Sequence, residues 1–294
     1  MDSEWIRPLL CPICAQPLAD YRQTWRCPTG HSFDVAREGY VNLRRSHKRL
    51  PETVGDAPEM LRARREFLSR GFYEPLSDLI NEQVVTAITN QPVPVVVDAG
   101  CGEGYYLGRL AQRLAGQGAK GVSLFGLDIA KTAVRMAAKQ VGGHGRFLVT
   151  DLNGRLPFAD QSVQVLLNLF APRHPVEFAR LIRPDGLLLT VIPAPDHLQS
   201  LRDRFGLLGI QAEKQAHMAT QFAGLFALQP VQTITFPLYL DNHALSCLVQ
   251  MMPGARHLTP PQQEAIAYAS AVETVASFVV LPMIRSGGMV MRDA

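Results

Sequence analysis

Near-continuous runs of apolar residues alternate with segments of helical spacing from Val93 toward the C-terminal end of the chain. Runs rich in Val, Ile and Leu are typical of parallel strands that are buried on both faces of a sheet. The helical segments between them fit right-handed crossover connections. The pattern predicts a doubly wound α/β sheet, with strands at PVPVVVDAG, SLFGLDIA, RFLVTD, VQVLLNLFA, GLLLTVIPA, VQTITFPLYL and TVASFVVLPMI.

The residues before this sheet follow other patterns. Residues 1–45 are short apolar pieces separated by Pro, Gly and Cys, without a helical period, which predicts a small loop-rich module. Five basic residues and one acid lie between Arg37 and Arg49, as in a solvated linker. Asp56 is a plausible N-cap for a helical segment that Gly71 interrupts, so two helices are expected. The predicted divisions are 1–45, 46–92 and 93–294.

Composition narrows the class of protein. The chain has 294 residues, of which 47% are hydrophobic and 19% charged, enough for one large core plus a small module. The formal net charge of +3 permits an anionic partner without requiring one. Uncharged apolar runs stay well short of the ~20 residues of a membrane span, and MDSEWIRPLL lacks the pattern of a signal peptide. We therefore expect no membrane association and a cytoplasmic location.

A glycine-rich turn follows the first predicted strand of the sheet. Asp98 precedes Gly100, Gly102 and Gly104, and the helical segment YYLGRLAQRLA comes next. Glycine permits positive φ and lets backbone N–H groups approach a ligand at a helix N-terminus. A dinucleotide fold uses G-x-G-x-x-G, whereas this G-x-G-x-G turn resembles the loop of methyltransferases that holds the amino-acid end of S-adenosylmethionine. Asp98 is expected to order the loop.

Two further acidic residues end the next two predicted strands. Asp128 in GLDIA is placed to accept hydrogen bonds from ribose hydroxyls. Asp151 in TDLNGRLPF is placed to accept from the adenine amino group, with Leu152 packing on the ring. Each carboxylate has an alternative interpretation as a helix cap, and a Gly-rich turn occurs in many α/β proteins. Their common register with successive strands favours S-adenosylmethionine as the cofactor.

Three cysteines and a histidine near the N-terminus have the spacing of a metal site. Cys11 and Cys14 form C-x-x-C, and Cys27 and His31 follow as C-x-x-x-H. A closed Cys₃His set suits structural Zn²⁺ and leaves no position for a substrate water. The alternative is unliganded cysteines packed as small hydrophobic residues, which is the interpretation favoured for Cys101 and Cys247 elsewhere in the chain.

Several motifs together resemble the bacterial 23S rRNA (guanine-N1)-methyltransferases, the family that includes the tylosin-resistance enzyme. The resemblance covers nearly the whole chain and rests on CPIC with CPTGHSFDVAREGYVNL, on GDAPEMLRARREFLSRGFYEPL, on DAGCGEGYY, and on FAP followed by PAPDHLQSL. It implies an α/β fold: a doubly wound, mostly parallel, seven-stranded class I methyltransferase (Rossmann-like) sheet with a small N-terminal zinc-binding module. The divisions given above would then be a zinc-binding RNA-recognition module, a basic linker with helices, and the methyltransferase domain.

The resemblance also implies partners and site residues. It implies cofactor contacts from Tyr73, Gly102, Glu103 and His197. It implies a homodimer that binds a 23S rRNA hairpin, with the zinc modules lining the cleft. Members of the family modify neighbouring guanines of one loop, so the target guanine stays open, as does a role in antibiotic resistance or in ribosome maturation.

The acceptor is expected at the carboxyl end of the fourth strand, where open α/β sheets bind substrates. Asn168 is a candidate for contacting the base edge, Arg173 for stabilising O6 or gripping phosphate, and His174 for taking the N1 proton. Structural roles remain the alternative for all three, and no general base is assigned. Candidate phosphate contacts, or else a solvated charged face, are Arg44, Arg45, Lys48, Arg49, Arg62, Arg64 and Arg65.

Two other functions compete with rRNA methylation. The same cofactor loop serves small-molecule methyltransferases, although the cysteine module and the basic linker argue against that class. A catalytically inactive rRNA-binding protein is the other alternative, against which the intact glycines and Asp128 argue.

Overall fold

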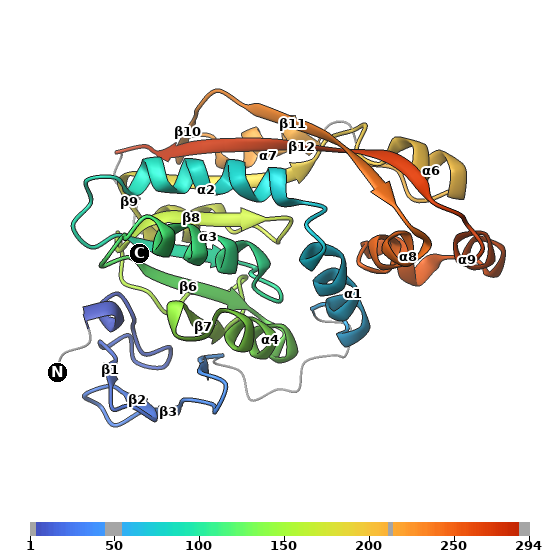
Figure 1. Ribbon diagram of the computed structural model, residues 1–294. Helices are drawn as coiled ribbons and strands as arrows, with labels where there is room; N and C mark the ends of the chain where they lie inside the picture. The colour runs from blue at the N-terminus through green and yellow to red at the C-terminus, as the bar shows by residue number, and fades with distance from the viewer. Residues whose placement is uncertain (1–3, 45–54, 211–213, 288–294) are drawn as a thin grey trace.

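The computed structural model of the protein describes residues 4–44, 55–210 and 214–287, and Figure 1 shows the arrangement of its elements. The centre is a nine-stranded sheet in the order β10-β12-β9-β8-β5-β6-β7-β4, with β11 also paired to β12. Pairs from β4 to β9 are parallel, and β12 runs antiparallel to β9, β10 and β11. The strands are β4 (Tyr40–Asn42), β5 (Val95–Ala99), β6 (Ser123–Asp128), β7 (Arg146–Val149), β8 (Val163–Leu169), β9 (Ile182–Pro193), β10 (Phe226–Leu228), β11 (Gln232–Leu240) and β12 (Val272–Arg285).

Helices cover both faces of this sheet, and two hydrophobic cores result. Side chains from alternate positions of β5 enter different cores: Val96 packs under α2, α3 and α4, whereas Val97 packs on the opposite face with α5, α7 and the N-terminal module. The first core also takes in α6 and α8, which with α9 form a lobe beyond the sheet (Figure 1). The helices are α1 (Pro58–Ser69), α2 (Glu74–Ile88), α3 (Tyr105–Gly116), α4 (Lys131–Val141), α5 (Pro175–Leu181), α6 (Gln199–Phe205), α7 (Lys214–Phe222), α8 (Asn242–Gln250) and α9 (Pro260–Ala267).

The N-terminal module is a three-stranded antiparallel sheet of β1 (Ala19–Asp20), β2 (Thr24–Arg26) and β3 (Ser32–Asp34). It docks on the loop that follows β7. The Leu10 N–H donates to the carbonyl of Pro157 at 3.0 Å, and the Ala159 N–H donates to that of Pro8 at 2.8 Å. Trp5 adds its ring, which lies 4.6 Å from the Arg146 guanidinium of β7.

Two details differ from the sequence predictions. Nine strands form the sheet rather than seven, because β10 adds a short piece and β4, from the end of the predicted module, pairs in parallel with β7. A three-residue strand paired with residues about a hundred positions away leaves no local pattern. Asp56 also does not cap α1: the N-cap is Ala57, with no side-chain cap, and Asp56 instead accepts from Arg64.

The divisions of the chain into 1–45, 46–92 and 93–294 stay a prediction. In the described residues, no helix combines the length and apolarity that crossing a membrane requires.

Candidate active site and metal centre

The glycine loop joins β5 to α3 at the carboxyl edge of the sheet, and all three glycines have positive φ. A Cβ on Gly100 would lie 2.3 Å from the Ala171 Cβ, and one on Gly104 would lie 2.7 Å from the Ala137 Cβ. Packing therefore excludes side chains at both positions. A Cβ on Gly102 would meet only the Arg64 guanidinium, at 3.4 Å. Arg64, on α1, thus lies over the middle of the loop.

Asp128, at the end of β6, orders the loop. One of its carboxylate oxygens accepts from the Gly102 N–H at 3.0 Å and the other from the Ala130 N–H at 2.8 Å. The expectation that Asp98 orders the loop is wrong, since its buried Oδ1 has no hydrogen-bond partner among the described residues. A buried carboxyl oxygen without a partner is unusual and makes Asp98 a candidate for contacting a ligand.

Three carboxylates gather at this loop in a buried setting. Burial, together with the nearby Asp128 and Glu103, raises the pKa of Asp98 to about 8. Burial raises the pKa of Glu103 to about 7, against the opposing effect of Arg64 and Arg65. Burial also raises the pKa of Asp128, despite its two backbone hydrogen bonds. Buried acids with an orphan oxygen fit a ligand that brings positive charge, as the ammonium and sulfonium of S-adenosylmethionine do.

The basic residues of α1 divide between two environments. Arg64 forms a 2.5 Å ion pair with Asp56 beside the loop, and the Arg65 guanidinium donates to the Met136 carbonyl of α4 at 3.0 Å. Arg62 stays on the surface, with a 65% exposed side chain that pairs with Glu59. Of these three candidate phosphate contacts, Arg62 alone therefore faces outward, and Arg64 faces the cofactor loop.

The four predicted metal ligands converge in the N-terminal module, and their ligand atoms all lie within 4.8 Å of one another. The Cys14 and Cys27 sulfurs are 3.6 Å apart, and the His31 Nδ1 lies 3.4 Å from the Cys27 sulfur and 3.7 Å from that of Cys11. Tetrahedral Zn²⁺ with Zn–S bonds of about 2.3 Å separates its sulfurs by about 3.8 Å. The spacing therefore fits zinc in a closed site.

The thiols of this cluster are also chemically suited to metal. Burial opposes ionisation of Cys27, but hydrogen bonds from Thr29, Cys14 and His31 lower its pKa to about 6. A thiolate is the form that ligates Zn²⁺. Cys101 and Cys247 are buried away from the cluster as free cysteines, in agreement with a packing role.

Comparisons with known proteins match both parts of the chain. The RlmA N-terminal zinc-ribbon family matches residues 9–49, and the methyltransferase domain family matches residues 96–186. A 23S rRNA (guanine(748)-N1)-methyltransferase from Streptomyces fradiae is 38% identical over 264 residues, covering 89% of this chain and 90% of the relative. A protein of Micromonospora griseorubida, provisionally named as a 23S rRNA (guanine-N1)-methyltransferase, is 39% identical over 302 residues, which is 97% of this chain and 99% of the relative.

The chain belongs to the 23S rRNA (guanine-N1)-methyltransferase family. The resemblance drawn from the motifs is thereby confirmed, as is the class I methyltransferase fold with its zinc module. A solved protein of Galdieria sulphuraria, provisionally named as a sarcosine dimethylglycine methyltransferase, superposes with a TM-score of 0.50 at 13% identity and covers 79% of this chain and 100% of that one. That similarity concerns the fold alone.

Tyr73 and His197, which the family resemblance assigns to cofactor binding, lie in one aromatic cluster. Their rings are 6.4 Å apart, and both pack on Phe278 of β12, at 5.0 Å from Tyr73 and 4.5 Å from His197. Burial lowers the pKa of His197 to about 4, so the imidazole is neutral, and burial raises the pKa of Tyr73. The His197 Nδ1 lies 3.1 Å from the backbone nitrogen of Ser277, which anchors the ring to β12.

Asp151 and Leu152 lie where the loop after β7 meets the glycine loop. The Leu152 side chain is buried and would lie 3.8 Å from a Cβ on Gly100. One Asp151 oxygen accepts from the backbone and side-chain nitrogens of Asn153, at 3.0 and 3.2 Å, in a local turn. The ends of three successive strands thus come together, as their register predicts.

The candidate catalytic residues lie at the end of β8 and in the loop after it, and the structure shows their contacts. Asn168 is fully buried and donates to the carbonyls of Ala99 and Pro172, at 3.3 and 2.9 Å. It therefore ties the end of β5 to the loop after β8 through its side-chain nitrogen, while its buried Oδ1 has no hydrogen-bond partner among the described residues. The expected contact of Asn168 with the base edge stays a prediction.

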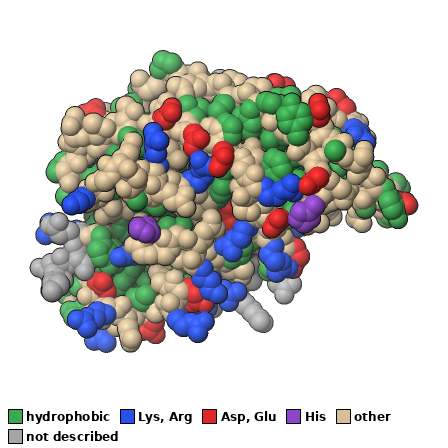
Figure 2. All heavy atoms as spheres, in the orientation of Figure 1, with side chains coloured by type: hydrophobic (Ala, Val, Ile, Leu, Met, Phe, Trp, Pro, Cys, Tyr) green, Lys and Arg blue, Asp and Glu red, His purple; other side chains and the backbone are tan. Residues whose placement is uncertain are grey.

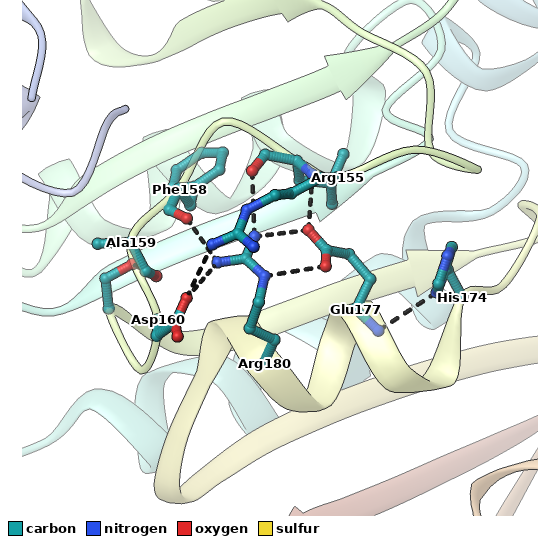
Figure 3. Close-up of polar contacts among 9 residues, drawn as sticks. Arg155, Phe158, Ala159, Asp160, His174, Glu177 and Arg180 are labelled. Carbon is teal, nitrogen blue, oxygen red and sulfur yellow. Dashed lines mark hydrogen bonds and ion pairs between the residues drawn. The ribbon is translucent and has the colours of Figure 1, made fainter. Parts of the chain in front are cut away.

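His174 is the N-cap of α5: its Nδ1 accepts from the Glu177 N–H at 3.2 Å (Figure 3). The Nδ1 is thus engaged in capping the helix, and the expected role of His174 in taking the N1 proton stays a prediction. Arg173 is partly buried, and its Nη1 lies 3.5 Å from the Gln221 Oε1. Within residues 4–44, 55–210 and 214–287 no carboxylate forms an ion pair with Arg173, and its expected contact with O6 or phosphate stays a prediction.

Figure 3 also shows a buried ion pair that sequence reasoning missed. Arg180 pairs with Glu177 at 2.5 Å and with Asp160 at 2.7 Å, and it donates to the carbonyls of Leu156 and Phe158. Glu177 in turn accepts from the Leu156 N–H at 2.6 Å. These contacts fix the loop on which the N-terminal module docks.

Among the expected RNA contacts of the linker, Arg44 is described and partly buried. The others, Arg45, Lys48 and Arg49, lie outside the described residues.

Proposed function

We propose that the protein transfers a methyl group from S-adenosylmethionine to N1 of a guanine in a hairpin loop of 23S rRNA. The observation that carries this proposal is the near full-length relationship to the Streptomyces fradiae enzyme, which is named for that reaction at guanine 748. The relationship to the Micromonospora griseorubida protein, which covers 97% of this chain, spans both the Cys/His cluster and the carboxylates at the glycine loop. A methyltransferase that acts on small molecules would have no evident need for the N-terminal Cys/His module.

The residues at the glycine loop divide by charge in a way that suits the two ends of the cofactor. Asp98 and Glu103 would take the ammonium, Arg64 the carboxylate, and Asp128 the ribose hydroxyls. Asp151 and Leu152 would hold the adenine, and Tyr73 with His197 would close the site from the other side. When bound, S-adenosylmethionine supplies a methyl group that is already activated on sulfur.

The chain's own contribution is then positioning and electrostatics. Asn168 fixes the backbone of the acceptor loop, and the buried aromatic cluster excludes water. Loss of the N1 proton leaves charge on the O6 of guanine. The Arg173 guanidinium, which has no carboxylate partner in the described parts of the chain, would stabilise that charge.

The zinc module, the linker and α1 would form the RNA-binding surface. On the face shown in Figure 2, Lys and Arg side chains gather over the lower half, around α4 and α1, interspersed with carboxylates. Extrusion of a guanine costs less from a hairpin loop than from a duplex, and loops are where RNA sequence is usually read. We further propose that the protein is a homodimer, with the zinc modules lining the RNA cleft, and that it acts in the cytoplasm.

One assay separates this function from its alternatives. The protein is incubated with labelled S-adenosylmethionine and unmodified 23S rRNA, and the methylated base is mapped. We expect transfer to one guanine N1, and no transfer by an Asp98→Ala variant. Binding of rRNA without transfer would support the inactive RNA-binding protein, and transfer to a small acceptor alone would support the small-molecule enzyme. Sedimentation of the free protein tests the homodimer.

A further inference from the structure

Phe170, the residue that follows β8, combines two unfavourable properties. Its φ of +59° lies in the left-handed region, which a bulky L-residue rarely adopts. Its side chain is also 45% exposed, although it is a large apolar ring. Strain of this kind persists where the surrounding structure enforces it, and it concentrates at functional sites.

The loop that holds Phe170 is fixed from both sides. The Phe170 N–H donates to the Val191 carbonyl at 3.2 Å, and the Asn168 side chain donates to the Pro172 carbonyl at 2.9 Å. The next residue, Ala171, packs so closely on Gly100 that no side chain fits there. The direction of the Phe170 ring is therefore set by the loop that also builds the cofactor site.

The inner side of the ring rests on the aromatic cluster of that site. Its centroid lies 5.5 Å from that of Phe278 and 6.4 Å from that of Tyr106. Phe278 in turn packs on Tyr73 and His197. Phe170 is thus the exposed outer member of an aromatic cluster whose inner rings, Phe278, Tyr73 and His197, are buried, at the carboxyl edge of the sheet where acceptors bind.

We propose that Phe170 is the stacking platform for the acceptor guanine, on which the extruded base is held with N1 facing the methyl group. This inference rests on the proposed rRNA function and adds the residue that positions its substrate. A flat ring suits this task because every nucleobase has a π face, and stacking on protein aromatics stabilises extruded bases. A Cβ-branched or aliphatic side chain offers no such surface.

The test compares Phe170→Leu and Phe170→Tyr with Tyr268→Leu. Tyr268 is an equally aromatic but 84% exposed residue after α9, so its replacement controls for loss of any surface ring. The substrate is an rRNA hairpin that the wild-type protein methylates. We expect Phe170→Leu to lower single-turnover transfer about 5- to 150-fold, the equivalent of about 1–3 kcal/mol of stacking. Phe170→Tyr and Tyr268→Leu should stay near the wild-type rate.

Two further measurements distinguish stacking from a structural role. The affinity for S-adenosylhomocysteine should be the same in wild type and Phe170→Leu, because the ring does not hold the cofactor. A 6-thioguanosine at the acceptor position should photocrosslink to the peptide that contains Phe170. An unchanged transfer rate in Phe170→Leu, a crosslink to another segment, or an equal loss of cofactor affinity would each overturn the inference.

The outcome also separates this inference from the function on which it rests. A wild-type protein that transfers no methyl group to 23S rRNA would refute both. An active wild type with a fully active Phe170→Leu variant would refute the platform and leave the function standing.

Discussion

Replacing Arg64 by Gln should weaken binding of the amino-acid end of the cofactor and leave binding of its nucleoside end unchanged. Arg64 lies over Gly102 and is held there by Asp56, with a side chain that is 24% exposed. Gly102 is the loop glycine at which a Cβ would have room, and Arg64 is the basic residue closest to it. We therefore expect it to bind the cofactor's carboxylate.

The size of the effect follows from the kind of contact that is lost. A hydrogen bond to a charged group contributes about 1.5–3 kcal/mol, which corresponds to a change of roughly 10- to 150-fold in Kd. Loss of the Asp56 pair adds little, since that pair is partly exposed to solvent. The change should fall at the lower end of this range if water reaches the carboxylate.

Calorimetry with two ligands makes the assay specific. S-adenosylhomocysteine carries the amino acid, whereas methylthioadenosine lacks it. Arg64→Gln should raise the Kd of the first by roughly 10-fold or more and leave that of the second within about 2-fold. Arg62→Gln is the matched control, because Arg62 is on the same helix with a 65% exposed side chain. An equal loss for both ligands, or for neither, would refute the assignment of Arg64 to the carboxylate.

Four other predictions follow from the structure. In the cofactor-free protein the folded-state pKa of Asp98 is about 8, against an ordinary value near 4. Between these values the folded state holds a proton that the unfolded state has lost, so the melting temperature should fall as pH rises from 6 to 8.5. The Asp98→Asn variant should flatten that slope. Removing Zn²⁺ with a strong chelator should lower the melting temperature and release a single ion per chain, and a Cys27→Ser variant should bind zinc weakly before any treatment. Arg180→Met should destabilise the protein by about 3–5 kcal/mol in urea unfolding, because it leaves Glu177 buried without its partner. Arg155→Met removes an exposed contact to the same Asp160 and should lower the free energy of unfolding by less than about 1 kcal/mol. Equal losses in the two variants would contradict the role of burial. Replacing Arg44, Arg45, Lys48 and Arg49 together by Gln should weaken RNA binding and flatten its dependence on salt, and an unchanged salt slope would exclude the linker from the interface.

The features that sequence predicted correctly are those that leave a local pattern. The strands of the sheet are almost continuous in Val and Leu because both of their faces are buried. The glycines of the loop follow a spacing that positive φ and close packing require, and the metal ligands follow the spacing of two short turns. Each of these constraints acts between residues close in sequence.

The features that sequence missed depend on which residues, far away along the chain, pack against a side chain in the folded protein. Arg62, Arg64 and Arg65 look alike on one helix, and only the packing of α1 turns Arg64 toward the cofactor loop. Asn168 and His174 have side chains that suit catalysis, but each hydrogen-bonds to backbone groups that only the folded loop places nearby. The exposed ring of Phe170, on a left-handed backbone, also has no signal in the sequence.

Strand β4 has a consequence for how this protein can be divided. It belongs to the N-terminal part of the chain, yet it is the outermost strand of the large sheet and covers the edge of β7. A catalytic fragment that begins at Val93 would expose that edge, with its unpaired N–H and C=O groups, to the edges of other molecules. We therefore expect the zinc ribbon and the enzyme domain to fold as one unit. An exchange of ribbons between family members would have to carry β4 along with the cysteines.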